Sequence, residues 1–295
     1  MTLATVFSRA QVGLESPLVT VEVHIANGLP SFSIVGLPET SVKEAKDRVR
    51  SAILNCGYEF PAKRIIVNLA PADLPKEGGR YDLPIAVGIL LASNQLPAIN
   101  IDQYEFVGEL ALSGELRNIA GEIPIAIACS QGKRILVLPE ASATNAQWVN
   151  DCQLMPVGHL NQLFPHFSGQ QQLPLQDKVP AQASFYTNTL ADMADVIGQP
   201  MAKRALELAA SGGHNLLFIG PPGTGKTMLA SRLAGILPTM TEQEAIESAS
   251  IRSLSHHHID KDNLFIRPFR APHHTASAAA LIGGGCKIQY YLQLN

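Results

Sequence analysis

One short motif constrains this chain more than any other feature. An apolar segment at residues 215–219 runs directly into a glycine-rich loop that ends in Lys226 and Thr227, and apolar residues at helical spacing follow from Met228 to Ile236. The loop matches GxxxxGK(S/T), which joins a strand to a helix and cradles phosphate groups. The sequence therefore predicts a strand, a loop and a helix that together bind a nucleotide.

The residue types of this loop explain the chemistry that we expect of it. Its glycines allow backbone conformations closed to other residues, so that successive N–H groups turn toward one point at a helix N-terminus. Lys226 is expected to reach the β- and γ-phosphate oxygens of ATP, and the Thr227 hydroxyl to ligate Mg²⁺. The predicted nucleotide-binding residues are Gly220, Pro221, Pro222, Gly223, Thr224, Gly225, Lys226 and Thr227.

Strand-like and helical patterns alternate upstream of the loop. Strands are predicted at residues 18–25, 32–35, 64–69, 105–111 and 135–138, and helices at residues 40–56, 83–91 and 123–131. The Asn27-Gly28 pair lies between the first two strands and favours a hairpin there. This alternation predicts an α/β domain over residues 1–165.

A change in composition separates this domain from the loop. Residues 166–189 are rich in Gln, Pro and Ser, lack apolar periodicity, and are predicted to be an exposed linker. A second domain is expected over residues 190–295, with a helix at residues 200–210 ahead of the phosphate loop.

Composition excludes several other classes of protein. The net charge of −3 gives no overall basic field for nucleic acid, and no apolar run approaches the roughly 20 residues of a membrane span. The N-terminus lacks a signal-peptide pattern, and the four cysteines lack metal-binding spacing. We therefore expect a cytoplasmic protein without a membrane partner, whose cysteines act as small buried hydrophobic residues.

The region after the loop is the most basic part of the chain. Residues 256–258 and 273–274 are histidines, for which a polar loop is favoured over a metal site, because adjacent side chains point different ways. Arg267 and Arg270 are candidates for DNA binding, and a solvated surface is the alternative.

Longer segments resemble a known family. The stretch ADVIGQPMAKRALELAASGGHNLLFIGPPGTGKTMLA is similar to the start of an AAA+ ATPase of the magnesium-chelatase-like group. RPFRAPHHTASAAALIGGG, and GLPETSVKEAKDRVRSAILNCGYEFPAKRIIVNLAPADLPKEGGRYDLPIAVGIL in the first half, resemble the ComM/YifB family within that group. The resemblance extends over essentially residues 1–285.

The resemblance implies properties that residue spacing does not show. Such AAA+ modules form rings, usually hexamers, with ATP bound between subunits, and their DVIGQ box lies against adenine. Val196, Ile197 and Gly198 are therefore candidate contacts to the base. The ComM/YifB family implies DNA binding and branch migration in natural transformation, whereas the chelatase relatives imply remodelling of a metal-inserting protein complex.

The first domain resembles the proteolytic domain of Lon, an α/β fold of the ribosomal protein S5 domain 2 type. When the segments are matched, Leu83 takes the place of the protease serine and Ile123 that of its lysine. Because neither side chain can act as a nucleophile or a base, the resemblance implies a scaffold without peptidase activity.

ATP hydrolysis requires carboxylates that the sequence after Thr227 does not supply in the expected pattern. The family implies an acidic strand, Walker B, beyond Gly285, but residues 263–295 contain no Asp or Glu, and residues 286–295 match nothing expected. We therefore expect a chain truncated before Walker B, with an incomplete AAA+ domain that hydrolyses ATP poorly. An inactive fragment is the remaining alternative.

Overall fold

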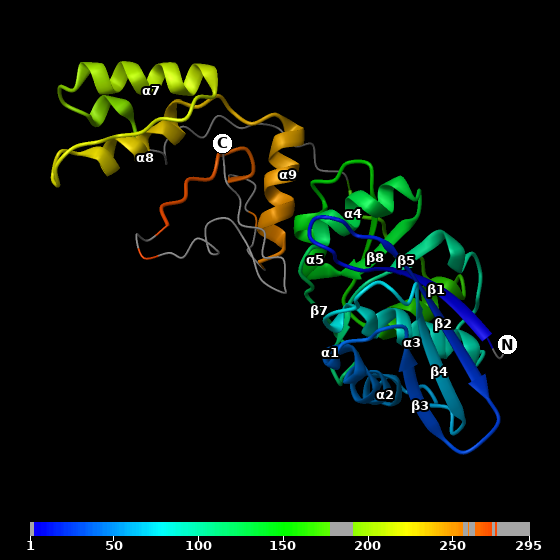
Figure 1. Ribbon diagram of the computed structural model, residues 1–295. Coiled ribbons are helices and arrows are strands. Elements are labelled where there is room, and N and C mark those ends of the chain that lie inside the picture. The colour runs from blue at the N-terminus through cyan, green and yellow to red at the C-terminus, as the bar shows by residue number, and fades with distance from the viewer. Residues whose placement is uncertain (1–2, 178–190, 256–258, 260–262, 273–274, 276–295) are drawn as a thin grey trace. The chain divides into compact units, whose positions relative to one another are not determined.

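The computed structural model describes residues 3–177, 191–255, 259, 263–272 and 275. The chain divides into two units, one of residues 1–180 with 250–258 and the other of residues 181–249 with 259–295. The first unit contains a large sheet covered by helices, and the second is mainly helical in its described part (Figure 1).

Within the described residues, the first unit is built on a seven-stranded sheet in the order β3-β4-β2-β1-β5-β8-β9. Its strands are β1 (Leu3–Arg9), β2 (Leu18–Ala26), β3 (Ser31–Val35), β4 (Arg64–Ala70), β5 (Tyr104–Phe106), β8 (Ile135–Pro139) and β9 (Gln153–Val157). β2 is antiparallel to both of its neighbours, and the other pairs are parallel. A separate small sheet pairs β6 (Glu109–Leu110) with β7 (Leu116–Arg117).

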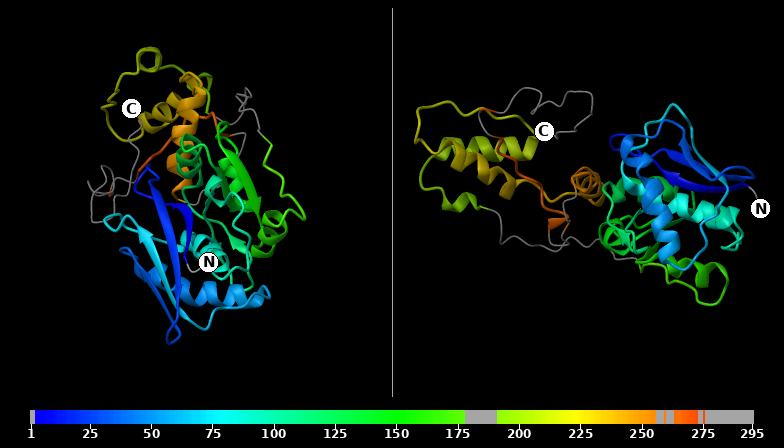
Figure 2. Two further views of the ribbon diagram at one scale, coloured as in Figure 1. Left: turned by 90° about the vertical axis from the view of Figure 1, so that its right-hand side faces the viewer. Right: turned by 90° about the horizontal axis from the view of Figure 1, so that it is seen from below.

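The helices of this unit are α1 (Thr40–Lys43), α2 (Ala45–Asn55), α3 (Asp82–Ala92), α4 (Glu122–Gln131), α5 (Glu140–Ala146) and α6 (Leu163–Phe167). α3 is buried along its whole length and packs against β1 and β2 (Figures 1 and 2). A Cβ atom at Gly88 would lie 2.5 Å from Cγ2 of Val23, so glycine is what allows α3 to approach β2 this closely.

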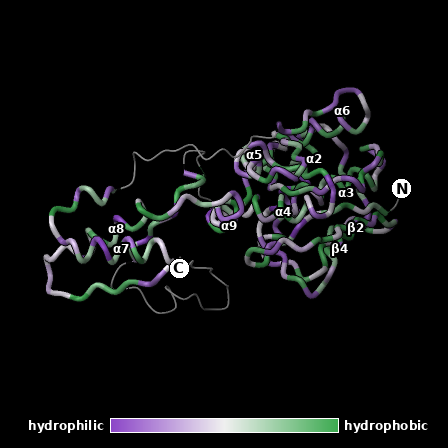
Figure 3. Tube along the Cα trace, turned by 90° about the horizontal axis from the view of Figure 1, so that it is seen from above, coloured by the Kyte–Doolittle hydropathy of each residue, from purple (hydrophilic) through white to green (hydrophobic). Residues whose placement is uncertain are grey.

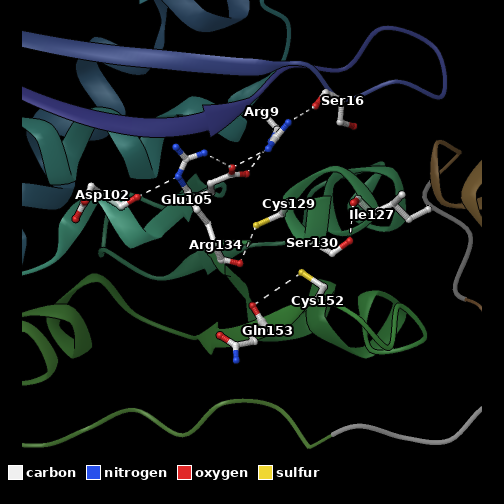
Figure 4. Close-up of polar contacts among 10 residues, drawn as sticks. All are labelled: Arg9, Ser16, Asp102, Glu105, Ile127, Cys129, Ser130, Arg134, Cys152 and Gln153. Carbon is white, nitrogen blue, oxygen red and sulfur yellow. Dashed lines mark hydrogen bonds and ion pairs between the residues drawn. The ribbon is translucent and has the colours of Figure 1, made fainter. Parts of the chain in front are cut away.

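A buried ion cluster joins the middle of the sheet. The carboxylate of Glu105 on β5 accepts two hydrogen bonds of 2.7 Å from Arg9 on β1 and one of 3.2 Å from Arg134 (Figure 4). The guanidinium of Arg134 also lies 4.2 Å from the centre of the Phe7 ring. These contacts satisfy a carboxylate that is fully removed from solvent.

The cysteines of the described residues act mainly as core side chains. Cys129 and Cys152 are buried free thiols near this cluster (Figure 4), and Cys56 is half-buried. Contact with Cys152 and burial both raise the pKa of the Cys129 thiol, which disfavours the reactive thiolate. The fourth cysteine, at position 286, lies outside the described residues.

The second unit contains α7 (Pro200–Gly212), α8 (Lys226–Ile236) and α9 (Glu242–Ser253), and the division between the units falls within α9. Hydrophilic and hydrophobic stretches alternate along α7 and α8 (Figure 3). Their apolar sides enclose a small core of Val196, Leu206 and Leu229, against which Phe218 packs.

The expected α/β class is confirmed, but the hairpin expected around Asn27-Gly28 is wrong. β2 and β3 are present, yet β4 lies between them and pairs with both. A turn signal reports only the local backbone, whereas strand order depends on which apolar faces can be buried together.

Three further elements differ from expectation. The helix expected at residues 40–56 is interrupted at Glu44, which separates α1 from α2. The strand expected at residues 105–111 splits between two sheets, because Gly108 bonds to Arg80 and Leu83 instead of continuing the ladder. No strand forms at residues 215–219, since no described segment pairs with them as a strand requires.

Candidate nucleotide-binding site

Residues 220–227 form a loop that leads into the N-terminus of α8. α8 begins at Lys226, and Gly225 at the N-cap has a left-handed φ of 80°. Gly223 has a φ of 82°, also in the region that side chains disfavour. Glycine at these two positions therefore lets the chain turn tightly into the helix.

The N-terminus of α8 has the properties of an anion site. The N–H groups in the first turn of an α-helix lack intrahelical acceptors, and the N-cap residue here, Gly225, supplies no side-chain acceptor for them. These donors and the positive end of the helix dipole favour a negatively charged group at this position. The loop is also exposed to solvent, apart from the half-buried Gly225 and Lys226.

The side chain of Lys226 folds back over the loop. Its Nζ donates hydrogen bonds to the carbonyl oxygens of Gly220 (2.8 Å) and Pro221 (2.7 Å), and lies 3.4 Å from Oγ1 of Thr224. Thr224 in turn donates to the Pro221 carbonyl at 3.0 Å. These contacts hold the ammonium group at the loop, where phosphate oxygens could replace the carbonyl acceptors. Thr227 is exposed in the first turn of α8.

The three candidate contacts to adenine differ in their surroundings. The Val196 side chain is 5% exposed and packs in the same core as Leu229 of α8, so it anchors this segment to the helix of the phosphate loop. Ile197 is 95% exposed, which leaves its side chain open to a ligand. Gly198 is exposed, with a φ of 72°.

The two candidate DNA-binding arginines also differ. Arg267 is half-buried and donates to the carbonyl of Pro238 (2.7 Å) and to both carboxylate oxygens of Glu244 (3.2 Å each). Hydrogen bonds from Thr241 and then from Arg267 lower the pKa of Glu244. The guanidinium of Arg267 is thus hydrogen-bonded within the second unit, whereas Arg270 is exposed.

The remaining sequence predictions for sites concern metal, membrane and protease chemistry. Histidines 256–258 and 273–274 lie outside the described residues, as does everything after residue 275. The part of the chain that is described holds no group of three metal-ligating side chains, and none of its helices is long and apolar enough to cross a membrane. Leu83 and Ile123, which were matched to the protease dyad, are both fully buried.

Sequence reasoning missed one contact at this site. Asp195, directly before Val196, forms an ion pair with Arg232 on α8. The two residues are far apart in the sequence and belong to no shared motif, so no pattern in the sequence signals their contact.

An exposed glycine-rich loop at the N-terminus of a helix, in a chain that also contains a mixed α/β domain, is typical of a P-loop protein with an additional domain. Two family models match the chain: subunit ChlI of Mg-chelatase matches residues 21–142, and magnesium chelatase, subunit ChlI, matches residues 192–290. The chain belongs to the magnesium-chelatase ChlI-like family that includes ComM and YifB.

Individual relatives match almost the whole chain. It is 55% identical to the competence protein ComM of Haemophilus influenzae over 97% of its length, which is 56% of that relative. It is 53% identical to the protein YifB of Salmonella typhimurium and 50% identical to YifB of Escherichia coli, with the same coverage of both sequences. The chain therefore spans about half the length of the curated relatives it matches.

Proposed function

We propose that the second unit binds ATP with Mg²⁺ through residues 220–227. The observation that carries this proposal is the N-terminus of α8, where left-handed Gly223 and Gly225 precede an uncapped first turn and Lys226 lies over the loop. Backbone N–H groups and one ammonium group are suited to a polyphosphate.

The residues of the loop also fit a magnesium nucleotide. Mg²⁺ prefers oxygen ligands and usually keeps several waters, so the Thr227 hydroxyl and the phosphates would be sufficient partners from this part of the chain. Bound Mg²⁺ would neutralise charge on the phosphates. The Lys226 ammonium would balance a further part of that charge by leaving the carbonyls of Gly220 and Pro221.

The base of the nucleotide is assigned to residues 196–198. Val196 fixes this segment to α8 through the core, while the exposed Ile197 offers an apolar surface for a purine ring. Gly198 leaves the neighbouring backbone accessible. The resemblance to AAA+ modules supports the same assignment.

For the whole protein we propose a ring-forming ATPase, hexameric as in related modules, that drives branch migration of DNA during natural transformation and recombination. The similarity to a protein named for competence supports this role. The exposed Arg270 is the better placed of the two candidate arginines for a DNA contact, since Arg267 is paired with Glu244.

The 295-residue chain is proposed to bind ATP but to hydrolyse it poorly. Residues 263–295 contain no carboxylate side chain that could orient the attacking water. Nucleotide binding requires only the phosphate loop and the surface for the base. We therefore expect this chain to bind ATP even though it hydrolyses ATP slowly.

Titration with a fluorescent ATP analogue tests the proposal. Lys226→Ala should weaken binding in the presence of Mg²⁺ by about tenfold or more, because a charge-assisted contact to phosphate is lost. Lys203→Ala, on α7 and outside the loop, is the matched control and should bind like the unaltered chain. Equal binding by the unaltered chain and Lys226→Ala would exclude this loop as the site, and rapid turnover would contradict the proposed deficiency.

A further inference from the structure

The helix that begins at the phosphate loop also holds the segment assigned to the base. Arg232 lies on α8, and its Nη2 is 3.5 Å from Oδ2 of Asp195. Asp195 is the last residue of a short 3-10 helix, Met193–Asp195, and leads directly into Val196 and Ile197. One helix therefore carries both Lys226, which is assigned to phosphate, and Arg232, which contacts the base segment.

Contacts within α8 orient the guanidinium of Arg232 toward Asp195. Nη1 donates to the carbonyl of Met228, one turn earlier on α8, at 3.0 Å and to Oγ of the neighbouring Ser231 at 3.1 Å. The side chain of Arg232 is only 15% exposed, whereas that of Asp195 is 58% exposed. The arginine is thus a fixed part of the helix surface, and Asp195 is held against it.

A second contact constrains the same short segment. Val196 is buried with Leu229 of α8, one turn before Arg232. The apolar contact fixes how deeply the segment packs, while the ion pair limits its rotation about the Val196 anchor. The exposed side chain of Ile197 follows immediately, so its direction depends on both contacts.

We infer that Asp195 and Arg232 are a positioning pair that sets the alignment of residues 196–198 relative to the phosphate loop. The inference rests on the proposed function. It adds that the affinity for polyphosphates that carry a base depends on this pair. The affinity for a ligand that contacts only the loop does not depend on the pair. Both residues lie outside the phosphate loop, so the pair acts through Val196 and Ile197.

Comparing the affinities for two ligands, ATP and tripolyphosphate, distinguishes a positioning role of the pair from a general effect on folding. Arg232→Ala and Asp195→Asn should each weaken binding of ATP with Mg²⁺ by about threefold to fivefold, as expected for a partly exposed ion pair. Binding of inorganic tripolyphosphate with Mg²⁺, measured by calorimetry, should stay within about twofold of the unaltered chain. Asp195→Asn keeps the side-chain shape at an exposed position, so it remains informative if Arg232→Ala folds poorly.

The matched control is Arg204→Ala, which removes an exposed ion pair of 2.9 Å to Glu207 on α7 and should change neither affinity. Reversing the pair, with Asp195→Arg and Arg232→Asp together, should recover part of the ATP affinity. Equal losses for ATP and tripolyphosphate, or no loss in either single variant, would overturn the inference. An unaltered chain that binds neither ligand would instead refute the proposed nucleotide site, and the inference with it.

Discussion

The buried carboxylate of Glu105 allows a quantitative test of what holds the first unit together. The residue is fully buried on β5 and accepts hydrogen bonds from Arg9 and Arg134. Glu105→Gln keeps the volume of the side chain but removes its charge and one of its acceptor oxygens. Two guanidinium groups would then lose their only carboxylate partner within salt-bridge distance among the described residues.

The expected loss follows from the burial of the pair. Removing one partner of a buried ion pair costs about 3–5 kcal/mol, because the remaining charge stays away from water without compensation. Arg9 is 8% exposed and Arg134 only half-buried, so the lower part of this range is expected. The exposed pair Arg204–Glu207 provides the comparison, since such pairs contribute about 0–1 kcal/mol.

Trp148 makes the measurement specific to the first unit. It is the only tryptophan of the sequence and is 2% exposed, directly after α5. Its fluorescence during urea unfolding should give a free energy of unfolding about 3 kcal/mol lower for Glu105→Gln, with the slope against urea unchanged. Glu207→Gln should unfold like the unaltered chain. A loss below about 1 kcal/mol for Glu105→Gln would show that the cluster does not contribute as argued.

Two further predictions concern pH and DNA. Burial raises the pKa of Asp82 to about 6 from 3.8, in spite of its ion pair with Arg48. Because the folded state holds this proton more tightly, stability should fall by about 3 kcal/mol as pH rises from about 4 to 6. The midpoint of urea unfolding, measured against pH, should lose this decrease in Asp82→Asn. The same pH dependence in Asp82→Asn and the unaltered chain would contradict the prediction. Arg270→Ala should weaken DNA binding and lower its salt dependence by about one ion, whereas Arg267→Ala should chiefly destabilise the second unit; the opposite assignment would argue against Arg270 as the contact.

Local patterns predicted much of the fold correctly. β2, β4, β8, α3 and α4 lie where apolar periodicity placed them, because each buries one face or most of its residues. The central strand β1 and the edge strand β9 were not foreseen. β1 contains the buried Arg9, whose charge is paired with the distant Glu105, and this pairing is not visible in a local pattern.

In the candidate site, too, local sequence patterns identified some residues, while contacts between distant segments could not be predicted. Gly223, Gly225 and Lys226 were predicted from spacing alone, since the loop needs particular backbone conformations at fixed positions. The Asp195–Arg232 contact could not be predicted, because it brings together side chains from two separate segments. For the same reason the sequence could not show that Arg267 is paired with Glu244.

The sequence by itself determined the α/β class and the glycine-rich turn at residues 220–227 that leads into α8. Both depend on short-range requirements: the period of apolar residues and the backbone freedom of glycine. The tertiary structure alone decided that β4 separates β2 from β3, and that residues 215–219 form no strand. Strand order and pairing are decided by contacts between residues distant in the chain, and short stretches of sequence do not encode those contacts.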